Sequence, residues 1–282
     1  MQHLDGFAPL AARYDGFIVD LWGVVHDGVS PYPGAVACLS RLRAAGKRVV
    51  LLSNAPRRAE VAAAGMEAMG IARDLYTGLV TSGEVTHALL RDRDLPEYAA
   101  LGRRLYHLGP ERDRNVFAGL DYSDAARPAE ADFVLNTGPD DSRIPTEIGP
   151  WVAELAACRD AGLPMICANP DLEVIRGGAR LICAGALALH YAELGGTVRW
   201  VGKPDPAVYR PVFAQLGLPA ARVLAVGDAL RTDMAGAAAV GVDGCWVLGG
   251  IHGAELAGPQ AAEAAARAAG LAPCATLPAF RW

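Results

Sequence analysis

Four polar side chains occupy equivalent positions in separate parts of the sequence. Asp20, Ser53, Lys203 and Asp228 each stand at or just after the end of a short apolar run. Such runs are typical of strands buried on both faces of a parallel sheet. Two carboxylates, an ammonium and a hydroxyl at one sheet edge could bind a divalent cation and an anion, and one carboxylate could act as a nucleophile. Each residue alone also fits an ordinary turn or cap, so the interpretation depends on the joint pattern.

The elements that must position these residues alternate along the chain as strand, loop and helix. This alternation predicts a doubly wound α/β domain with right-handed crossovers, whose ligands bind at the carboxyl ends of its strands. A capping box from Thr81 to Glu84 is expected to open one helix. Strands are expected at 17–19, 49–52, 104–108, 132–135, 164–168, 198–201, 223–226 and 245–248, the last being the final strand, and helices at 35–45, 58–69, 82–90, 147–161, 234–240 and 260–269.

The middle of the chain has a strand–helix alternation of its own. Residues 82–182 are therefore expected to form an inserted domain, and residues 1–81 and 183–282 together the main domain. A chain of 282 residues is long enough for two domains of this size.

Four segments in this order resemble the motifs of one known family. FIVDLWGVVHDG, LLSNAPR, VGKPDP and VGDALRTD are similar to motifs I to IV of the haloacid dehalogenase superfamily. The likeness is to the branch with a large α/β cap between motifs II and III, which includes nitrophenyl-phosphatase-like, nucleotidase-like and pyridoxal-phosphatase-like enzymes. The segment ANPD at 168–171 matches the closing stretch of such a cap. The resemblance implies a Rossmann-like core, an inserted cap domain and a Mg²⁺-dependent phosphatase.

The resemblance also implies roles for the polar residues at the strand ends. Asp20 would attack phosphorus and form an aspartyl-phosphate, which water later hydrolyses. Ser53 would donate a hydrogen bond to a phosphoryl oxygen. Lys203 would neutralise Asp20 and the transferring group, where negative charge gathers. Asp233 would hold Lys203 or a metal-bound water.

Metal and substrate residues follow from the same likeness. The expected ligands of Mg²⁺ are the Asp20 carboxylate, the backbone carbonyl of Trp22 and Asp228, in keeping with the preference of this ion for oxygen. The expected substrate-binding residues, beside Ser53 and Trp22, are Asn54, which orients either the loop or the substrate, and Asn169 and Asp171 in the cap. An ordinary Asx-Pro turn is the alternative interpretation of Asn169.

Trp22 marks a departure from the family pattern. Family phosphatases usually carry a second aspartate two residues after the nucleophile, as general acid and base. Here the sequence reads Asp20-Leu21-Trp22, so ordinary alkyl phosphates are expected to turn over slowly. Three explanations are open: a leaving group that needs no proton, a proton supplied by His26, Asp27 or a cap residue, or a binding protein without turnover. The Trp22 ring could stack on a flat ligand or merely pack beneath the cap.

The remaining candidates for chemistry fit structural roles better. Arg57 and Arg58 could touch a substrate anion, but the beginning of a helix is the favoured interpretation. His26 stays a candidate, whereas the other histidines are interpreted as structural or surface residues: His3, His87, His107, His190 and His252. The six cysteines form no C-x-x-C pair, which favours buried thiols and a reducing cytoplasm.

Composition limits the classes of partner. The chain is 52% hydrophobic with a formal charge of -5 and no basic block, so a nucleic-acid groove is disfavoured. No secretory signal and no apolar run of about 20 residues is present, so a membrane is not expected as a partner. The resulting prediction is a cytoplasmic, Mg²⁺-dependent phosphohydrolase of small phosphorylated metabolites such as sugar phosphates or nucleotides, with a homodimer through the cap. The alternative is a catalytically impaired binding or regulatory protein with the same pocket.

Overall fold

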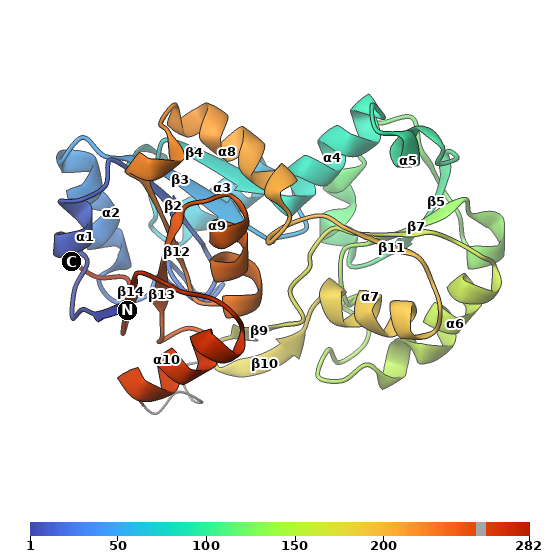
Figure 1. Ribbon diagram of the computed structural model, residues 1–282. Helices are drawn as coiled ribbons and strands as arrows, with labels where there is room; N and C mark the ends of the chain where they lie inside the picture. The colour runs from blue at the N-terminus through green and yellow to red at the C-terminus, as the bar shows by residue number, and fades with distance from the viewer. Residues whose placement is uncertain (252–257) are drawn as a thin grey trace.

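The computed structural model describes residues 1–251 and 258–282, and in it two parallel sheets lie side by side (Figure 1). The larger sheet has seven strands in the order β1-β14-β13-β12-β2-β3-β4. The order reverses direction along the chain at β2, as in doubly wound folds. The strands are β1 (Gln2–His3), β2 (Gly16–Val19), β3 (Arg48–Ser53), β4 (Gly78–Thr81), β12 (Val223–Gly227), β13 (Asp243–Val247) and β14 (Ala275–Leu277).

Helices cover both faces of this sheet because its strands are apolar on both sides. Phe17 and Val19 pack with α1, α2 and α3 in one cluster. Ile18, between them, faces the opposite way and packs with α8 and α9, as the two-residue period of a strand requires. The helices of this domain are α1 (Ala8–Ala11), α2 (Ala35–Ala44), α3 (Ala59–Ala68), α8 (Tyr209–Leu216), α9 (Ala235–Ala239) and α10 (Pro259–Ala268).

The second sheet has the order β11-β8-β7-β5-β6 and is also covered on both faces. Its strands are β5 (Arg104–Leu108), β6 (Ser123–Asp124), β7 (Phe133–Asn136), β8 (Met165–Cys167) and β11 (Val198–Trp200). Its helices are α4 (Ser82–Asp92), α5 (Pro96–Ala99), α6 (Val152–Asp160) and α7 (Ala184–Glu193). The expected fold class, α/β with doubly wound parallel sheets, is thus confirmed.

An antiparallel hairpin lies between the two sheets. It consists of β9 (Glu173–Arg176) and β10 (Ala179–Ile182). Gly177 and Gly178 form its two-residue turn with φ of 54° and 83°, a conformation that type I′ hairpins require and glycine adopts without strain. In Figure 1 the hairpin lies beneath the junction of the two sheets.

Several boundaries differ from those expected. β11 pairs with β8, and α7 packs on the second sheet, so the boundary expected at residue 183 assigned both to the wrong sheet. An apolar run does not specify its partner strand, because pairing depends on contacts made elsewhere in the chain. β14, not the run at 245–248, is the last strand. The helix expected at 147–161 begins at Val152 after a 3₁₀ turn, and the one expected at 234–240 begins as a π-helical turn at Leu230–Met234.

Two further observations concern the chain as a whole. Within the described residues, no helix has the length and apolar character needed to cross a membrane. His252, one of the histidines interpreted as structural or surface, lies outside the described residues.

Candidate active site

Three of the expected residues meet at the carboxyl edge of the large sheet. Asp20 directly follows β2, Ser53 ends β3 and Asp228 directly follows β12. These strands are neighbours in the order β12-β2-β3, so the three side chains share one edge. All three are buried.

Lys203 reaches the same place from the other sheet. It follows β11, which belongs to the second sheet, so the expectation that its strand lies in the main sheet was wrong. Its Nζ donates to Asp20 Oδ1 and Asp233 Oδ1, both at 2.7 Å, and to the Leu52 carbonyl at 3.2 Å. Burial by itself lowers the pKa of Lys203, but the two carboxylates outweigh it and raise that pKa well above its usual value. Lys203 is therefore held as a cation.

Asp233 positions this lysine. Its Oδ1 accepts from Lys203, and its Oδ2 accepts from the Ala229 backbone N–H at 3.1 Å. Both oxygens are engaged, so of its two expected roles the structure places it in contact with Lys203. The π-helical turn at Leu230–Met234 carries it there.

The carboxylate cluster fits a divalent cation. Ligand oxygens of Asp20, Asp228 and Asp233 lie within 4.8 Å of one another. Three carboxylates and the Lys203 ammonium carry a formal charge of -2, which a divalent cation would balance. Burial raises the pKa of Asp228 to about 7, with a further contribution from Asp233, because two like charges cannot share a dry site without a counter-ion.

Glycines leave room for the Asp228 carboxylate. A Cβ built at Gly23 or Gly250 would lie 1.9 or 2.0 Å from Asp228 Oδ2. The Ile251 backbone N–H donates to the same oxygen at 2.7 Å, and the Trp246 indole holds the Asp228 carbonyl at 2.8 Å. The carboxylate is thereby oriented, whereas a metal-binding role for the Trp22 carbonyl stays a prediction.

Asn54 joins the two parts of the molecule. Its Oδ1 accepts from the Lys203 backbone N–H at 2.7 Å, and its Nδ2 donates to Asp171 Oδ1 at 2.8 Å. The side-chain amide is thus occupied by protein groups. Of the two roles considered for Asn54, these contacts fit orientation of the loop.

Trp22 lies beneath the hairpin and also faces open space. Its Nε1 donates to the Ile175 carbonyl on β9 at 2.8 Å, and its ring meets His26 edge-on with centroids 5.5 Å apart. Trp22 also lines two cavities beside the cluster. The Trp22 ring therefore packs beneath the cap and also faces the space in which a ligand would bind.

Neither neighbour of Trp22 suits the missing proton donor. Burial lowers the pKa of His26 to about 4, so its ring is neutral near pH 7, and its Nδ1 accepts from the Gly28 N–H at 3.0 Å. Backbone N–H groups of Ser30 and Val29 lower the pKa of Asp27, which keeps that carboxylate ionised. These electrostatics disfavour both as the source of the proton.

Two cavities adjoin the cluster. One, of about 250 Å³, is lined by Ser53, Trp22, Asn169 and Asp171 together with residues of the second sheet and the hairpin. The other, of about 220 Å³, contains Asp20 and Asp228 and shares Trp22 and Asp171 with the first. Asn169 Oδ1 accepts from the Asp171 backbone N–H at 2.9 Å, so the Asx turn is present in a loop that also lines the cavity.

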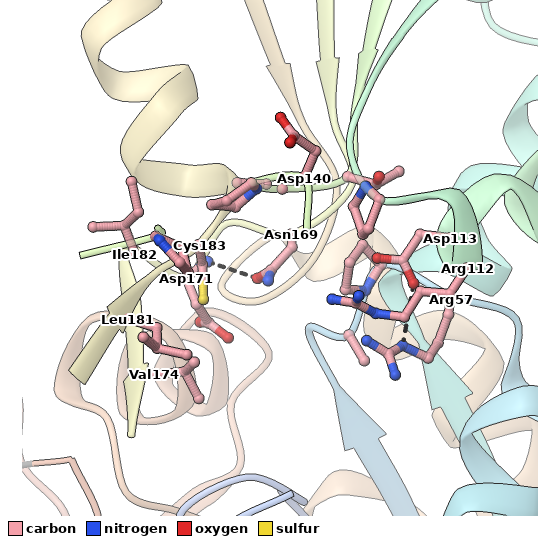
Figure 2. A pocket seen from close by; sticks show the side chains of 18 of the residues that line it. Arg57, Arg112, Asp113, Asp140, Asn169, Asp171, Val174, Leu181, Ile182 and Cys183 are labelled. Atoms are coloured by element: carbon pink, nitrogen blue, oxygen red, sulfur yellow. Dashed lines mark hydrogen bonds and ion pairs between the residues drawn. The ribbon is translucent and has the colours of Figure 1, made fainter. Parts of the chain in front are cut away.

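The first cavity has walls of opposite character (Figure 2). Val174 and Leu181 of the hairpin stand on one side, and Arg57, Arg112 and Asp113 on the other. For Arg57 and Arg58 the favoured interpretation was the beginning of a helix, and this holds for Arg58 alone. Arg58 is the N-terminal cap residue of α3 and pairs with Glu84, whereas Arg57 lines the cavity.

Sequence reasoning missed most of this wall. Arg112 and Asp113 lie in a 3₁₀ turn at Glu111–Val116, far from any motif. They meet Arg57 only because the two sheets fold against each other. A buried carboxylate in an irregular turn leaves no periodic signal that could have indicated its role.

Comparisons with known proteins agree with this geometry. Residues 17–123 match a family model described as haloacid dehalogenase-like hydrolase, and residues 200–274 match a second haloacid dehalogenase-hydrolase-like model. The chain is 31% identical over 255 residues to a D-glycerol 3-phosphate phosphatase of Mycobacterium tuberculosis, covering 87% of this chain and 66% of that protein. The chain therefore spans slightly less than two thirds of that relative.

Solved structures show the same likeness. A haloacid dehalogenase-like hydrolase from Brucella suis 1330 has a TM-score of 0.83 and 34% identity, covering 98% of this chain and 99% of that one. A glycerol phosphate phosphatase from Mycobacterium tuberculosis in complex with magnesium has a TM-score of 0.64 and 29% identity, covering 86% of this chain and 70% of that one. A divalent metal is thus present in a structure of a similar protein.

Proposed function

The chain belongs to the haloacid dehalogenase-like hydrolase family, and we propose on this basis that it is a Mg²⁺-dependent phosphohydrolase of small phosphorylated metabolites. The observation that carries the proposal is the single buried cluster of Asp20, Lys203, Asp228 and Asp233. Such a cluster supplies a nucleophile, a fixed cation and a place for a metal, which phosphoryl transfer requires.

The protein's own groups account for the first half of the reaction. A carboxylate oxygen of Asp20 attacks phosphorus, the bond from phosphorus to the leaving oxygen breaks, and an aspartyl-phosphate results. Lys203 stabilises the phosphoryl oxygens, and Ser53 donates a hydrogen bond to one of them. Mg²⁺ held by Asp20, Asp228 and the Trp22 carbonyl would offset the repulsion between carboxylates and the phosphate dianion.

We assign to Asp171 the role of donating a proton to the leaving oxygen. This carboxylate lines both cavities, beside Asp20 in one and Ser53 in the other. Burial raises the pKa of Asp171, while Lys203 and Asn54 oppose the shift; an upward shift is the direction that a general acid requires. In the second half of the reaction, the water that cleaves the aspartyl-phosphate returns a proton to Asp171.

The decisive experiment combines substrates and one variant. Nitrophenyl phosphate and a panel of alkyl phosphates should be hydrolysed with Mg²⁺, and Asp20→Asn should lower turnover by at least about 10⁴-fold, because an amide cannot form the acyl phosphate. Asp27→Asn, at a partly exposed neighbouring carboxylate, is the matched control and should stay active. Activity that survives in Asp20→Asn would exclude this mechanism.

A second candidate function rests on Trp22. A ring in place of the usual acid is the change expected of a protein that binds phosphorylated ligands without turnover. Complete inactivity of the natural protein, together with Mg²⁺-dependent binding of phosphate esters, would favour that alternative. A homodimer through the second domain and a cytoplasmic location belong to the proposal and are checked by sedimentation and by fractionation of cells.

A further inference from the structure

The turn that carries Asp233 also reaches the second domain. Leu230–Met234 forms a π-helical turn after β12, and the buried Asp233 in it engages Lys203. Arg231, two positions earlier, is exposed and points another way, because residues two apart in a helix do not share a face. Its Nη2 donates to the backbone carbonyl of Pro170. One turn of the main domain is therefore in contact both with Lys203 and with a loop of the second domain.

The Pro170 carbonyl belongs to the loop that carries Asp171. This loop joins β8 to the hairpin, and Figure 2 shows Asn169 and Asp171 on it. The Asp171 backbone N–H donates to Asn169 Oδ1 at 2.9 Å, and the Asp171 carbonyl accepts from the Gly185 N–H at 3.0 Å. A Cβ at Gly185 would lie 2.4 Å from the carbonyl oxygens of Pro170 and Asp171. The second domain thus holds the loop as one unit, close against α7.

Two side chains of the main domain contact this loop at different points. Asn54 donates to Asp171 Oδ1 at 2.8 Å, and Arg231 donates to the carbonyl one residue earlier. One contact alone would let the loop pivot, whereas two fix the direction of the carboxyl group toward the second cavity, which Asp20, Asp171 and Arg231 all line. Neither contact occupies Asp171 Oδ2, the oxygen that would carry the proton. A charged donor also makes the stronger hydrogen bond.

We propose that Arg231 is a positioning residue for proton transfer, which holds the Pro170 carbonyl so that the Asp171 carboxyl group faces the leaving oxygen. The proton moves from Asp171 Oδ2 to that oxygen as its bond to phosphorus breaks, and Asp171 is left as a carboxylate. Arg231 itself contacts no reacting atom, so its effect passes through Asp171. The inference rests on the proposed phosphatase function, with Asp171 as the acid, and adds the residue that orients this acid.

The test compares propyl phosphate, whose leaving group needs a proton, with nitrophenyl phosphate, whose leaving group does not. Arg231→Met keeps a long side chain but donates no hydrogen bond, so kcat for propyl phosphate should fall by about 10-fold, with a smaller change in KM. The kcat for nitrophenyl phosphate should change by less than about 2-fold. Arg231→Lys retains a charged donor and should recover part of the loss.

A double variant places the effect at Asp171. In the Asp171→Asn background the acid is absent, so adding Arg231→Met should lower propyl phosphate turnover by no more than about 2-fold. Arg43→Met is the matched control, because Arg43 is an exposed arginine of α2 that pairs with Asp74. It should leave the turnover of both esters unchanged.

The outcomes separate this inference from the proposed function. No turnover of nitrophenyl phosphate by the natural protein would overturn the proposed function and the inference with it. With that turnover present, unchanged rates in Arg231→Met, an equal loss for both esters, or a loss repeated in full in the Asp171→Asn background would overturn the inference alone. Arg231 is exposed, so its substitution empties no buried site, and Arg231→Gln takes the place of the Met variant if that variant fails to fold.

Discussion

At the scale of single residues, Trp22 stands where the resemblance to family phosphatases implies an aspartate. An indole N–H is not acidic near neutral pH, so Trp22 cannot act as a general acid. Here the N–H also donates a hydrogen bond to the Ile175 carbonyl. His26 is neutral and Asp27 is ionised. Asp171 is a partly buried carboxyl group with a raised pKa that lines both cavities, which is why the proton is assigned to it.

This assignment predicts how rates depend on the leaving group. In the natural protein, log kcat should depend weakly on leaving-group pKa, because Asp171 protonates poor leaving groups. Asp171→Asn keeps an oxygen that can accept from Asn54 but removes the acid, so alkyl phosphates should slow by about 10²–10⁴-fold and nitrophenyl phosphate by much less. The plot of log kcat against leaving-group pKa should therefore become steep in this variant.

A rescue experiment checks the same assignment. Trp22→Asp, made in the Asp171→Asn background, restores a carboxyl group at the position usual in the family and should flatten the plot again. The slope is the quantity to compare, because loss of the large ring also changes binding. A plot that is steep in the natural protein, or an equal loss for all esters in Asp171→Asn, would show that Asp171 is not the acid.

At the scale of elements, the β9–β10 hairpin determines the shape of the site. It carries Val174 and Leu181 into the first cavity, and the bond from Trp22 Nε1 to Ile175 ties it to the loop after β2. The second domain is thus attached to the nucleophile loop through a residue two positions from Asp20.

Removing that bond should loosen the hairpin. Trp22→Phe keeps an aromatic ring and the backbone carbonyl but leaves the Ile175 carbonyl without its donor, at a cost of about 1 kcal/mol. Amide exchange over residues 173–182 should become faster, and KM should rise by about 3- to 10-fold with a smaller change in kcat. Trp282→Phe, at an exposed tryptophan at the C-terminus, is the control. Unchanged exchange would mean that packing alone holds the hairpin.

At the scale of the whole molecule, stability should depend on the ionisation of Asp113. Burial raises its pKa to about 6, partly offset by Arg57 and Arg112, from 3.8. The folded state therefore binds this proton more tightly than the unfolded state does. The free energy of unfolding should fall as pH rises from about 4 to 6, by about 3 kcal/mol for a shift of this size.

Asp113→Asn removes this ionisation and isolates its effect. The variant should gain stability relative to the natural protein as pH rises, which urea unfolding at pH 4.5, 6.0 and 7.5 would measure. Leu181→Ala, on the opposite wall, removes no ionisable group and should change stability equally at each pH. A difference between Asp113→Asn and the natural protein that does not change with pH would contradict the shifted pKa.

Much of the fold and of the cluster follows from local sequence. Apolar runs ending in Asp20, Ser53 and Asp228 predicted parallel strands with polar carboxyl ends, because a strand buried on both faces must be apolar throughout and can expose polar groups only where it ends. The helices near residues 35–45 and 58–69 were also predictable, since glycines with positive φ at Gly46 and Gly70 follow them. The four motifs then indicated the family.

Tertiary structure alone decided which strands pair and which distant residues meet at the site. The sequence predicted a strand near Val198 but not that it pairs with β8, so Lys203 reaches Asp20 from the second sheet and not from the first. It contained no sign that Arg57 meets Asp113, 56 positions along the chain, or that Trp22 holds the hairpin. Strand partners, ion pairs and shared cavities arise from contacts between distant segments. Local periodicity records whether a residue is buried, but not which residue it is buried against.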